Sequence, residues 1–310
     1  MDFSFTPEQD ELRSQARSFL EATETPTWAQ LAELGWTGVS VPEQAGGAGL
    51  TFLEEAILHE ELGRALYHGP FFSTMALTQP ALPPELLAEV AAGEASWTLA
   101  TGPLVPDLDT ADRIAVAAGN GVWELEGAER QVLSTSDETR PLGRLAGGAT
   151  IRQLAGPEVL PEIRRRARAA LALEACGVAR RALELGVEHA STREQFGKPI
   201  GVYQAISHPL ADTYAEVELA RSLALRAAWC VAEGDEQAET SCAAAKAYAA
   251  ETAVAACERS IQVHGGTGFT WEHVLHRLYK RAQWIHAFDA SPASLRSEVV
   301  AVLLDGEGVR

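Results

Sequence analysis

Residues 193–200 read Arg-Glu-Gln-Phe-Gly-Lys-Pro-Ile, and residues 261–270 read Ile-Gln-Val-His-Gly-Gly-Thr-Gly-Phe-Thr. Arg193 stands at the expected end of a long helix, where its guanidinium can donate two parallel hydrogen bonds to a phosphate. Phe196 can pack against a planar ring, and Gly197 permits a sharp turn. The alternative interpretation is an arginine that complements the helix dipole, followed by an ordinary C-terminal glycine.

The second string allows the same two interpretations. Gly265 and Gly266 expose backbone N–H groups and permit the close approach of a ligand, and Gln262 can donate to a polar cofactor. The alternative is a helix stop followed by a loop. The two strings therefore indicate either a site for a phosphate-bearing ligand or two plain helix ends.

The sequence around these strings is helical. Long segments rich in Ala, Leu, Glu and Arg have a broad apolar face and short connections, and they span residues 158–192, 199–233, 235–263 and 271–288. This pattern predicts a four-helix bundle, which we place over residues 157–310.

The N-terminal part, residues 1–94, also favours helices. Thr6 and Thr51 each begin a capping-box pattern, and Thr27 is placed to open a short helix between them. The three glycines within residues 41–49 predict irregular structure there. We therefore expect an N-terminal helical domain.

Residues 95–156 have a different character. Short segments with β-branched or aromatic residues alternate with Pro, Gly and the hairpin signal Asn120-Gly121, and they span residues 96–100, 113–117, 122–126 and 131–134. This pattern predicts a small β-domain, with Trp97 and Trp123 as core residues. The predicted fold is thus mainly α with a short middle β-domain.

Composition narrows the classes of function. The chain has 25 Lys plus Arg against 43 Asp plus Glu, a formal charge of −18, which disfavours nucleic acid and anionic membrane surfaces as partners. The four cysteines have no C-x-x-C spacing and are expected to be buried. The N-terminus lacks a signal-peptide pattern and no apolar run is long enough to span a membrane, so we expect a cytoplasmic protein without a membrane span.

Four strings in one order carry a family resemblance. Residues 34–50, residues 60–65, residues 193–200 with Gln204, and residues 261–270 resemble the corresponding motifs of acyl-CoA dehydrogenases. The resemblance implies that family's fold and α,β-dehydrogenation of an acyl-CoA thioester with FAD. It further implies that the adenosine and diphosphate half of an FAD belonging to a neighbouring subunit is held by Arg193, Phe196, Gln204, Gln262, Gly265 and Gly266.

The other half of the family's flavin site has no counterpart here. The β-domain is about half the usual extent and lacks the family strings that embrace the flavin ring. The chain therefore resembles the short subunit of bacterial two-component (α2β2) acyl-CoA dehydrogenases, which share FAD with a full-length partner subunit, often in lipid or sterol degradation. The electron acceptor implied is a protein like electron-transfer flavoprotein. The alternatives are a self-sufficient homo-oligomeric dehydrogenase and a non-catalytic scaffold or acyl-CoA-binding protein.

The resemblance offers one candidate for the catalytic base. The family's base is a Glu either just before an arginine of the first bundle helix, where Ala167 precedes Arg168 here, or after the last motif, where Asp289 aligns. Asp289 is one methylene shorter than Glu, which matters because general-base catalysis depends on position. The alternative is a helix cap, with Asp289 or Ser291 placed before Pro292.

Two further clusters are ambiguous. The basic run Arg164, Arg165, Arg166 and Arg168 could attract the phosphates of CoA or FAD, or could be a solvated helix face or a contact with an acidic partner. The histidines His208, His264, His273 and His276 do not form a convincing metal-binding set.

Overall fold

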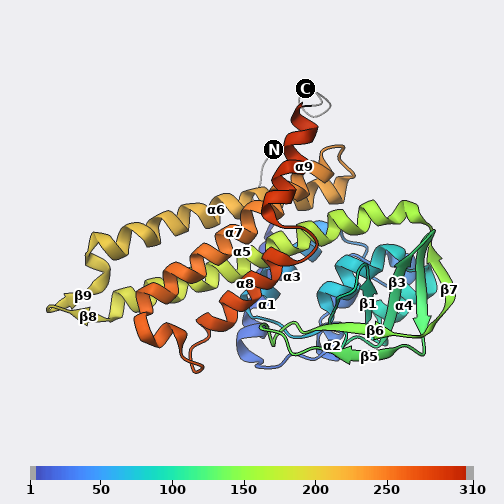
Figure 1. The fold of residues 1–310 in the computed structure, drawn as a ribbon, viewed down its shortest axis with the longest axis horizontal. Coiled ribbons are helices and arrows are strands. Elements are labelled where there is room, and N and C mark those ends of the chain that lie inside the picture. Colours follow the sequence, from blue (N-terminus) through green and yellow to red (C-terminus); the bar gives the residue numbers. More distant parts are fainter. Residues whose placement is uncertain (1–4, 305–310) are drawn as a thin grey trace.

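The computed structural model describes residues 5–304, and Figure 1 shows a long helical bundle with strands β1–β7 at one end. The bundle helices are α5 (Leu160–Thr192), α6 (Gln204–Glu233), α7 (Ala238–His264) and α8 (Leu275–Ala287). The last described helix, α9 (Pro292–Leu304), packs on α7 through Leu295 and projects from the bundle (Figure 1). The predicted bundle is confirmed, although α6 begins five residues later than expected because residues 198–202 form a strand and a 3-10 turn.

The N-terminal helices begin where the capping residues predict. Thr6 caps α1 (Pro7–Ala22), Thr27 caps α2 (Trp28–Glu33), and Thr51 caps α3 (Phe52–Arg64), each through a complete capping box. The rest of this part contains a π-helical segment, η3 (Phe72–Thr78), the helix α4 (Pro84–Ala91), and the 3-10 turns η1 (Trp36–Gly38), η2 (Glu43–Ala45) and η4 (Gln79–Ala81). Within residues 41–49, a single 3-10 turn at Glu43–Ala45 interrupts the predicted irregular structure.

Small residues and buried ion pairs join α3 to the bundle. A Cβ on Gly63 would lie 2.4 Å from the carbonyl oxygen of Glu174, and one on Gly177 would lie 1.9 Å from that of Glu60, so glycine is required where α3 crosses α5. Three buried glutamates of α3 each pair with an arginine of a different helix: Glu55 with Arg166 of α5, Glu60 with Arg221 of α6, and Glu61 with Arg17 of α1.

Seven strands form two sheets in the middle of the chain. The four-stranded sheet has the order β1-β3-β4-β7, with β1 parallel to β3 and the other pairs antiparallel; its strands are β1 (Trp97–Ala100), β3 (Arg113–Ala118), β4 (Gly121–Glu126) and β7 (Ala149–Ala155). The antiparallel three-stranded sheet has the order β2-β6-β5, with strands β2 (Val105–Pro106), β6 (Leu142–Ala146) and β5 (Glu129–Val132).

The predicted strands are confirmed in part. The hairpin at Asn120-Gly121 forms, but its two loop residues are Gly119 and Asn120. The segment predicted at 131–134 begins earlier, at Glu129, and β2, β6 and β7 were not predicted. Trp97 is fully buried as expected, whereas Trp123 is only half-buried. The sequence gives only a weak signal for these strands because β5 and most of β7 are exposed and lack an alternating apolar pattern.

One apolar core connects the helical parts and the four-stranded sheet, including Leu58 of α3, Trp97 of β1 and Leu171 of α5. All four cysteines are buried and unpaired, as predicted, and burial raises the pKa of the Cys176, Cys242 and Cys257 thiols. The domain limits 1–94, 95–156 and 157–310 stay a prediction. No helix in the described part of the chain is long and apolar enough to cross a bilayer.

Candidate functional site at the bundle end

The string at 193–200 forms a β-hairpin that projects from the end of the bundle (Figure 1). Helix α5 ends at Thr192, and β8 (Glu194–Gln195) pairs with β9 (Lys198–Pro199). The two loop residues, Phe196 and Gly197, have φ of 52° and 77°, which matches a type I′ turn. Phe196 stands at the hairpin tip and is 93% exposed, so its ring contacts no core of this chain and is available to a planar group outside it.

Three polar side chains at this end of the bundle are free to bind a ligand. Arg193 follows α5, Gln204 begins α6, and Gln262 lies in the last turn of α7; all three are exposed. None of the three side chains forms a hydrogen bond or ion pair with another residue among 5–304. A free guanidinium and two free amides are donors suited to a diphosphate.

The backbone beyond α7 is open. Gly265 has φ of 59°, in the left-handed region, and no atom lies within 4 Å of a Cβ built on either Gly265 or Gly266. A short 3-10 turn, η7 (Gly265–Phe269), follows. Backbone N–H groups in such an open glycine turn can approach an anion closely. The residue types and exposure here therefore fit the nucleotide half of FAD, and the roles of these residues stay predictions.

Arg193, Phe196, Gln204, Gln262, Gly265 and Gly266 are called the bundle-end residues below. Figure 1 places their elements, the β8–β9 hairpin, the start of α6 and the end of α7, at the same end of the bundle, far from strands β1–β7. Phe196 stands exposed at the hairpin tip, so a group that packs on its ring lies outside the core of this chain.

Asp289 lies in an ion pair rather than free in a cavity. Its Oδ2 accepts a hydrogen bond from Arg168 Nε at 2.9 Å, and its backbone has φ of 64°. Lys246 donates to the carbonyl oxygens on both sides of Asp289, those of Phe288 and Ala290, so this loop is anchored to α7. Burial lowers the pKa of Lys246 to about 8.

The cap of α9 is Ser291, whose Oγ accepts from the backbone N–H of Ser294 at 3.2 Å. Of the two residues proposed as caps, Ser291 is thus the one that acts. Asp289 neither caps the helix nor presents an unpaired carboxylate, so nothing in its geometry favours a base.

Three arginines of the basic run on α5, Arg164, Arg166 and Arg168, form ion pairs within the chain. Arg166 donates to Glu55 Oε2 at 2.6 Å and to Gln79, and Arg168 is 4% exposed and pairs with Glu298 as well as Asp289. Of the three interpretations offered for the run, neither phosphate attraction nor a solvated face fits these two arginines, and the acids that they contact belong to this chain rather than to a partner. Arginine spacing alone gives no information about acidic partners that are distant in sequence.

A buried ionic cluster at the junction of α5, α8 and the β-domain was not predicted. Arg281 of α8 is fully buried and donates to Asp137 at 2.8 Å and to Glu174 at 2.6 Å. Arg140 donates to Glu174 at 2.8 Å, and its guanidinium lies over the rings of Phe72 and Trp284, 5.0 and 4.9 Å from their centroids. We call Asp137, Thr139, Arg140, Glu174 and Arg281 the junction cluster.

The junction cluster closes the space between the helical parts and the β-domain. Its guanidiniums lower the pKa of the Asp137 and Glu174 carboxyls against the opposing effect of burial. Because every carboxylate in it is paired, the cluster offers no free base. The only sequence signal was an arginine on the apolar face of α8, next to Lys280, and it did not identify its partners.

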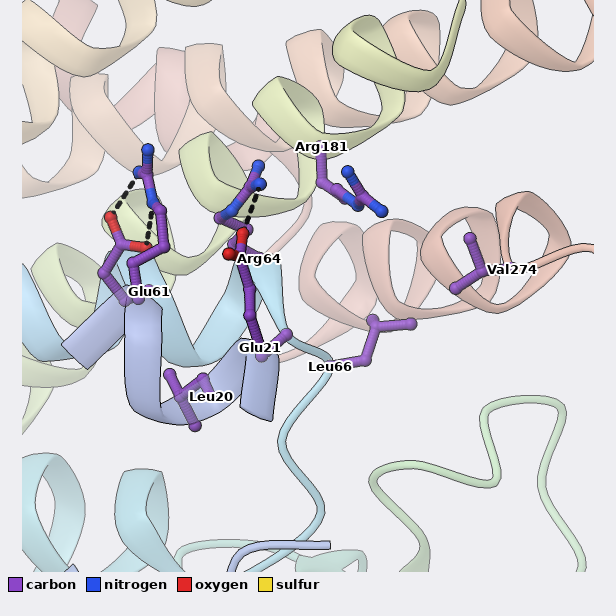
Figure 2. A pocket seen from close by; sticks show the side chains of 9 residues that line it. Leu20, Glu21, Glu61, Arg64, Leu66, Arg181 and Val274 are labelled. Carbon is purple, nitrogen blue, oxygen red and sulfur yellow. Dashed lines mark hydrogen bonds and ion pairs between the residues drawn. The ribbon is translucent and has the colours of Figure 1, made fainter. Parts of the chain in front are cut away.

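A separate surface cavity of about 350 Å³ lies between α1, α3, α5 and α8 (Figure 2). Its two glutamates are neutralised: Glu61 pairs with Arg17 and Glu21 with Arg64. Figure 2 shows Arg181 on the side away from Leu20, with Leu66 and Val274 completing an apolar wall. None of the bundle-end residues lines this cavity.

Comparison with known proteins gives the family. Acyl-CoA dehydrogenase IpdE2 of Mycobacterium tuberculosis is 37% identical over 262 residues, which cover 82% of this chain and 79% of that protein. The family models for the N-terminal and C-terminal domains of acyl-CoA dehydrogenases match residues 6–83 and 158–302. The chain belongs to the acyl-CoA dehydrogenase family.

Two solved structures confirm the predicted fold. A variant of the Tcur3481-Tcur3483 steroid acyl-CoA dehydrogenase is 27% identical, has a TM-score of 0.87, and aligns over 97% of this chain and 99% of that one. The ChsE4-ChsE5 complex from Mycobacterium tuberculosis is 24% identical with a TM-score of 0.87, over 98% of this chain and 99% of that one. The chain is thus a member of an oxidoreductase family of flavoproteins, as its motifs predicted.

Proposed function

We propose that this chain is the short subunit of a heteromeric, FAD-dependent acyl-CoA dehydrogenase, and that it binds the nucleotide half of FAD. The observation that carries the proposal is the contrast between two places in the fold. The bundle-end residues present side-chain donors without partners, whereas both carboxylates of the junction cluster, Asp137 and Glu174, are paired with guanidiniums.

The bundle-end residues have distinct parts in this proposal. Arg193 and the backbone at Gly265 and Gly266 hold the diphosphate, and Gln262 and Gln204 donate to the polar groups of the adenosine half. Phe196 packs against a planar ring. When bound, FAD supplies the acceptor for the β-hydride of an acyl-CoA thioester, and the α-proton goes to a base in the full-length partner subunit.

The names of similar proteins support the assembly and the substrate class. One similar structure is described as a steroid acyl-CoA dehydrogenase and another as a complex of two proteins. We therefore infer a partner that carries the flavin ring, a steroid or other ring-bearing acyl-CoA as substrate, and a protein like electron-transfer flavoprotein as acceptor.

The test is flavin content with and without a partner. Co-expression with a full-length family member should give a yellow complex with one FAD for each pair of different subunits, and the chain purified alone should be colourless. Arg193→Gln should lower the FAD content of the complex. Arg296→Gln, which removes an exposed arginine paired with Glu251 on α7, is the matched control and should leave it unchanged. Stoichiometric FAD on the isolated chain would contradict the proposal.

The same preparations test the two alternatives. A self-sufficient homo-oligomer with Asp289 as base should be yellow alone and should lose turnover in Asp289→Asn. The ion pair between Asp289 and Arg168 argues against it. A scaffold or acyl-CoA-binding protein should bind CoA esters or a partner with no flavin in any preparation, and the free Arg193 and Gln262 argue against that role.

A further inference from the structure

Three imidazoles lie against one another beside the bundle-end residues. His189 is in the last turn of α5, His264 is the last residue of α7, and His273 precedes α8. The ring centroids of His189 and His264 are 4.2 Å apart with planes at 27°, and those of His264 and His273 are 4.5 Å apart. All three rings are partly exposed, so a solute can reach this histidine stack.

Hydrogen bonds determine which nitrogen carries the hydrogen in the neutral form of two of these rings. His264 Nδ1 lies 2.8 Å from the carbonyl oxygen of Ser260, so Nδ1 carries the hydrogen and Nε2 is the site that gains a proton. His273 Nδ1 accepts from the backbone N–H of Leu275 at 3.3 Å, which places its hydrogen on Nε2. The ring nitrogens not used in these bonds are left for a ligand.

No carboxylate neutralises the stack among residues 5–304. The two histidine ion pairs of the described chain, His59 with Glu55 and His68 with Asp109, lie elsewhere. A positive charge on His264 disfavours the protonated forms of both His189 and His273; Arg193, just after α5, acts in the same way on His189, and His276 of α8 on His273. Burial and these like charges lower the pKa of His189 and His273, which favours the neutral form of these two rings.

The acidic residues of the surrounding elements engage other groups or lie in solvent. Glu258 of α7 contacts Tyr279, and Glu272 interacts with His276. Glu188 of α5 and Glu194 of β8 are exposed and form no ion pair in the described part of the chain. The stack is therefore a set of latent positive charges without a built-in counter-ion, on a protein whose formal net charge is −18.

We propose that the histidine stack is a proton-dependent part of the nucleotide site, which takes up protons when the diphosphate of an adenine dinucleotide binds beside Arg193. This inference rests on the proposed function. A bound dianion offsets the repulsion between the rings and the neighbouring positive charges, and so favours the protonated form of the rings. Binding is then linked to proton uptake, so affinity rises as the pH falls, by about tenfold for each unit by which the anion raises the pKa of one histidine.

The test is titration calorimetry of the full chain with ADP-ribose between pH ~8 and ~5.5, the range in which histidines titrate. Both phosphates of ADP-ribose are esterified, so the probe keeps its charge over this range. Wild type should bind about tenfold more tightly at the lower pH, and the heat should vary with the ionisation enthalpy of the buffer because protons are taken up.

Variants separate this inference from the proposed function. The triple variant His189→Gln, His264→Asn and His273→Asn keeps a polar group at each position, and its affinity should not vary with pH. The single variant His189→Gln, which disturbs neither backbone hydrogen bond, should show a reduced slope. His68→Gln removes a histidine that titrates outside the stack and should keep the full slope.

Each outcome has one meaning. Binding that depends on Arg193 but is constant with pH, or weakens at low pH, overturns the role of the stack and leaves the proposed function standing. A triple variant that folds and keeps the wild-type slope does the same. Failure of wild type to bind ADP-ribose at any pH, or binding unaffected by Arg193→Gln, overturns this inference, whereas the proposed function stands or falls with the FAD content of the co-expressed complex.

Discussion

Replacing Arg281 by Met tests whether the junction cluster holds the helical and β parts together. The guanidinium donates to Asp137 and Glu174, and also to the carbonyl oxygen of Tyr67 at 3.1 Å and to Thr139 Oγ1 at 2.7 Å. Methionine fills much of the same volume but leaves two buried carboxylates short of a partner. Breaking a buried pair in this way costs about 3–5 kcal/mol, and we expect the free energy of unfolding to fall by that amount.

The pKa shifts of the two carboxyls predict how the loss of stability in Arg281→Met changes with pH. In wild type the guanidiniums hold the pKa of both carboxyls below the usual range, so their contribution is present above pH ~4.5 and is lost as the pH falls through the folded pKa values. In Arg281→Met, burial without that partner raises the pKa of Asp137 instead. The difference in free energy of unfolding between wild type and the variant should therefore become smaller as the pH is lowered from ~7 to ~5.

The assay is urea unfolding at two pH values, followed by circular dichroism. The control is Arg296→Met, because Arg296 pairs with Glu251 at 2.6 Å while both side chains stay about half exposed. Such a surface pair contributes roughly 0–1 kcal/mol. If Arg281→Met loses no more stability than Arg296→Met, or if its deficit does not vary with pH, the assignment of the cluster as the lock between these parts is wrong.

Three further predictions, two for substitutions and one for thiol reactivity, follow from local geometry. Phe196→Asn should stabilise the free chain by about 1 kcal/mol, since Asn tolerates the left-handed backbone at the hairpin tip, yet should weaken FAD binding in the complex; thermal unfolding and flavin content measure the two effects. Ser291→Ala should destabilise α9 by about 1 kcal/mol through loss of its N-cap, measurable by chemical denaturation. Ellman's reagent should react with no thiol of the native chain and with all four in denaturant, because the cysteines are buried: Cys176, Cys230, Cys242 and Cys257.

Features that depend on neighbouring residues were predictable from the sequence. The helices capped by Thr6, Thr27 and Thr51 begin as predicted, because a cap and its partner lie within one turn. The end of α5 before Arg193 and the turn at Gly197 follow from the same kind of local rule. The motifs that marked the bundle-end residues are likewise short and continuous.

Features that depend on distant partners were not predictable. Arg166, Arg168 and Arg281 looked like ordinary cations, yet each pairs with an acid more than 100 residues away in sequence. Burial of an arginine is acceptable only with such partners, and no local pattern specifies them. The strands β2, β6 and β7 were missed for a related reason, since their pairing, rather than their composition, defines them.

The distribution of paired and unpaired cations links the fold to the proposed role. A chain with a formal charge of −18 has enough carboxylates to pair its arginines, and Arg140, Arg168 and Arg281 are all paired in the interior. Arg193 is exposed and unpaired among residues 5–304, next to an uncompensated histidine stack. Since a cationic group left free on such a surface raises the local potential for an anion, this placement favours an anionic ligand at the bundle end.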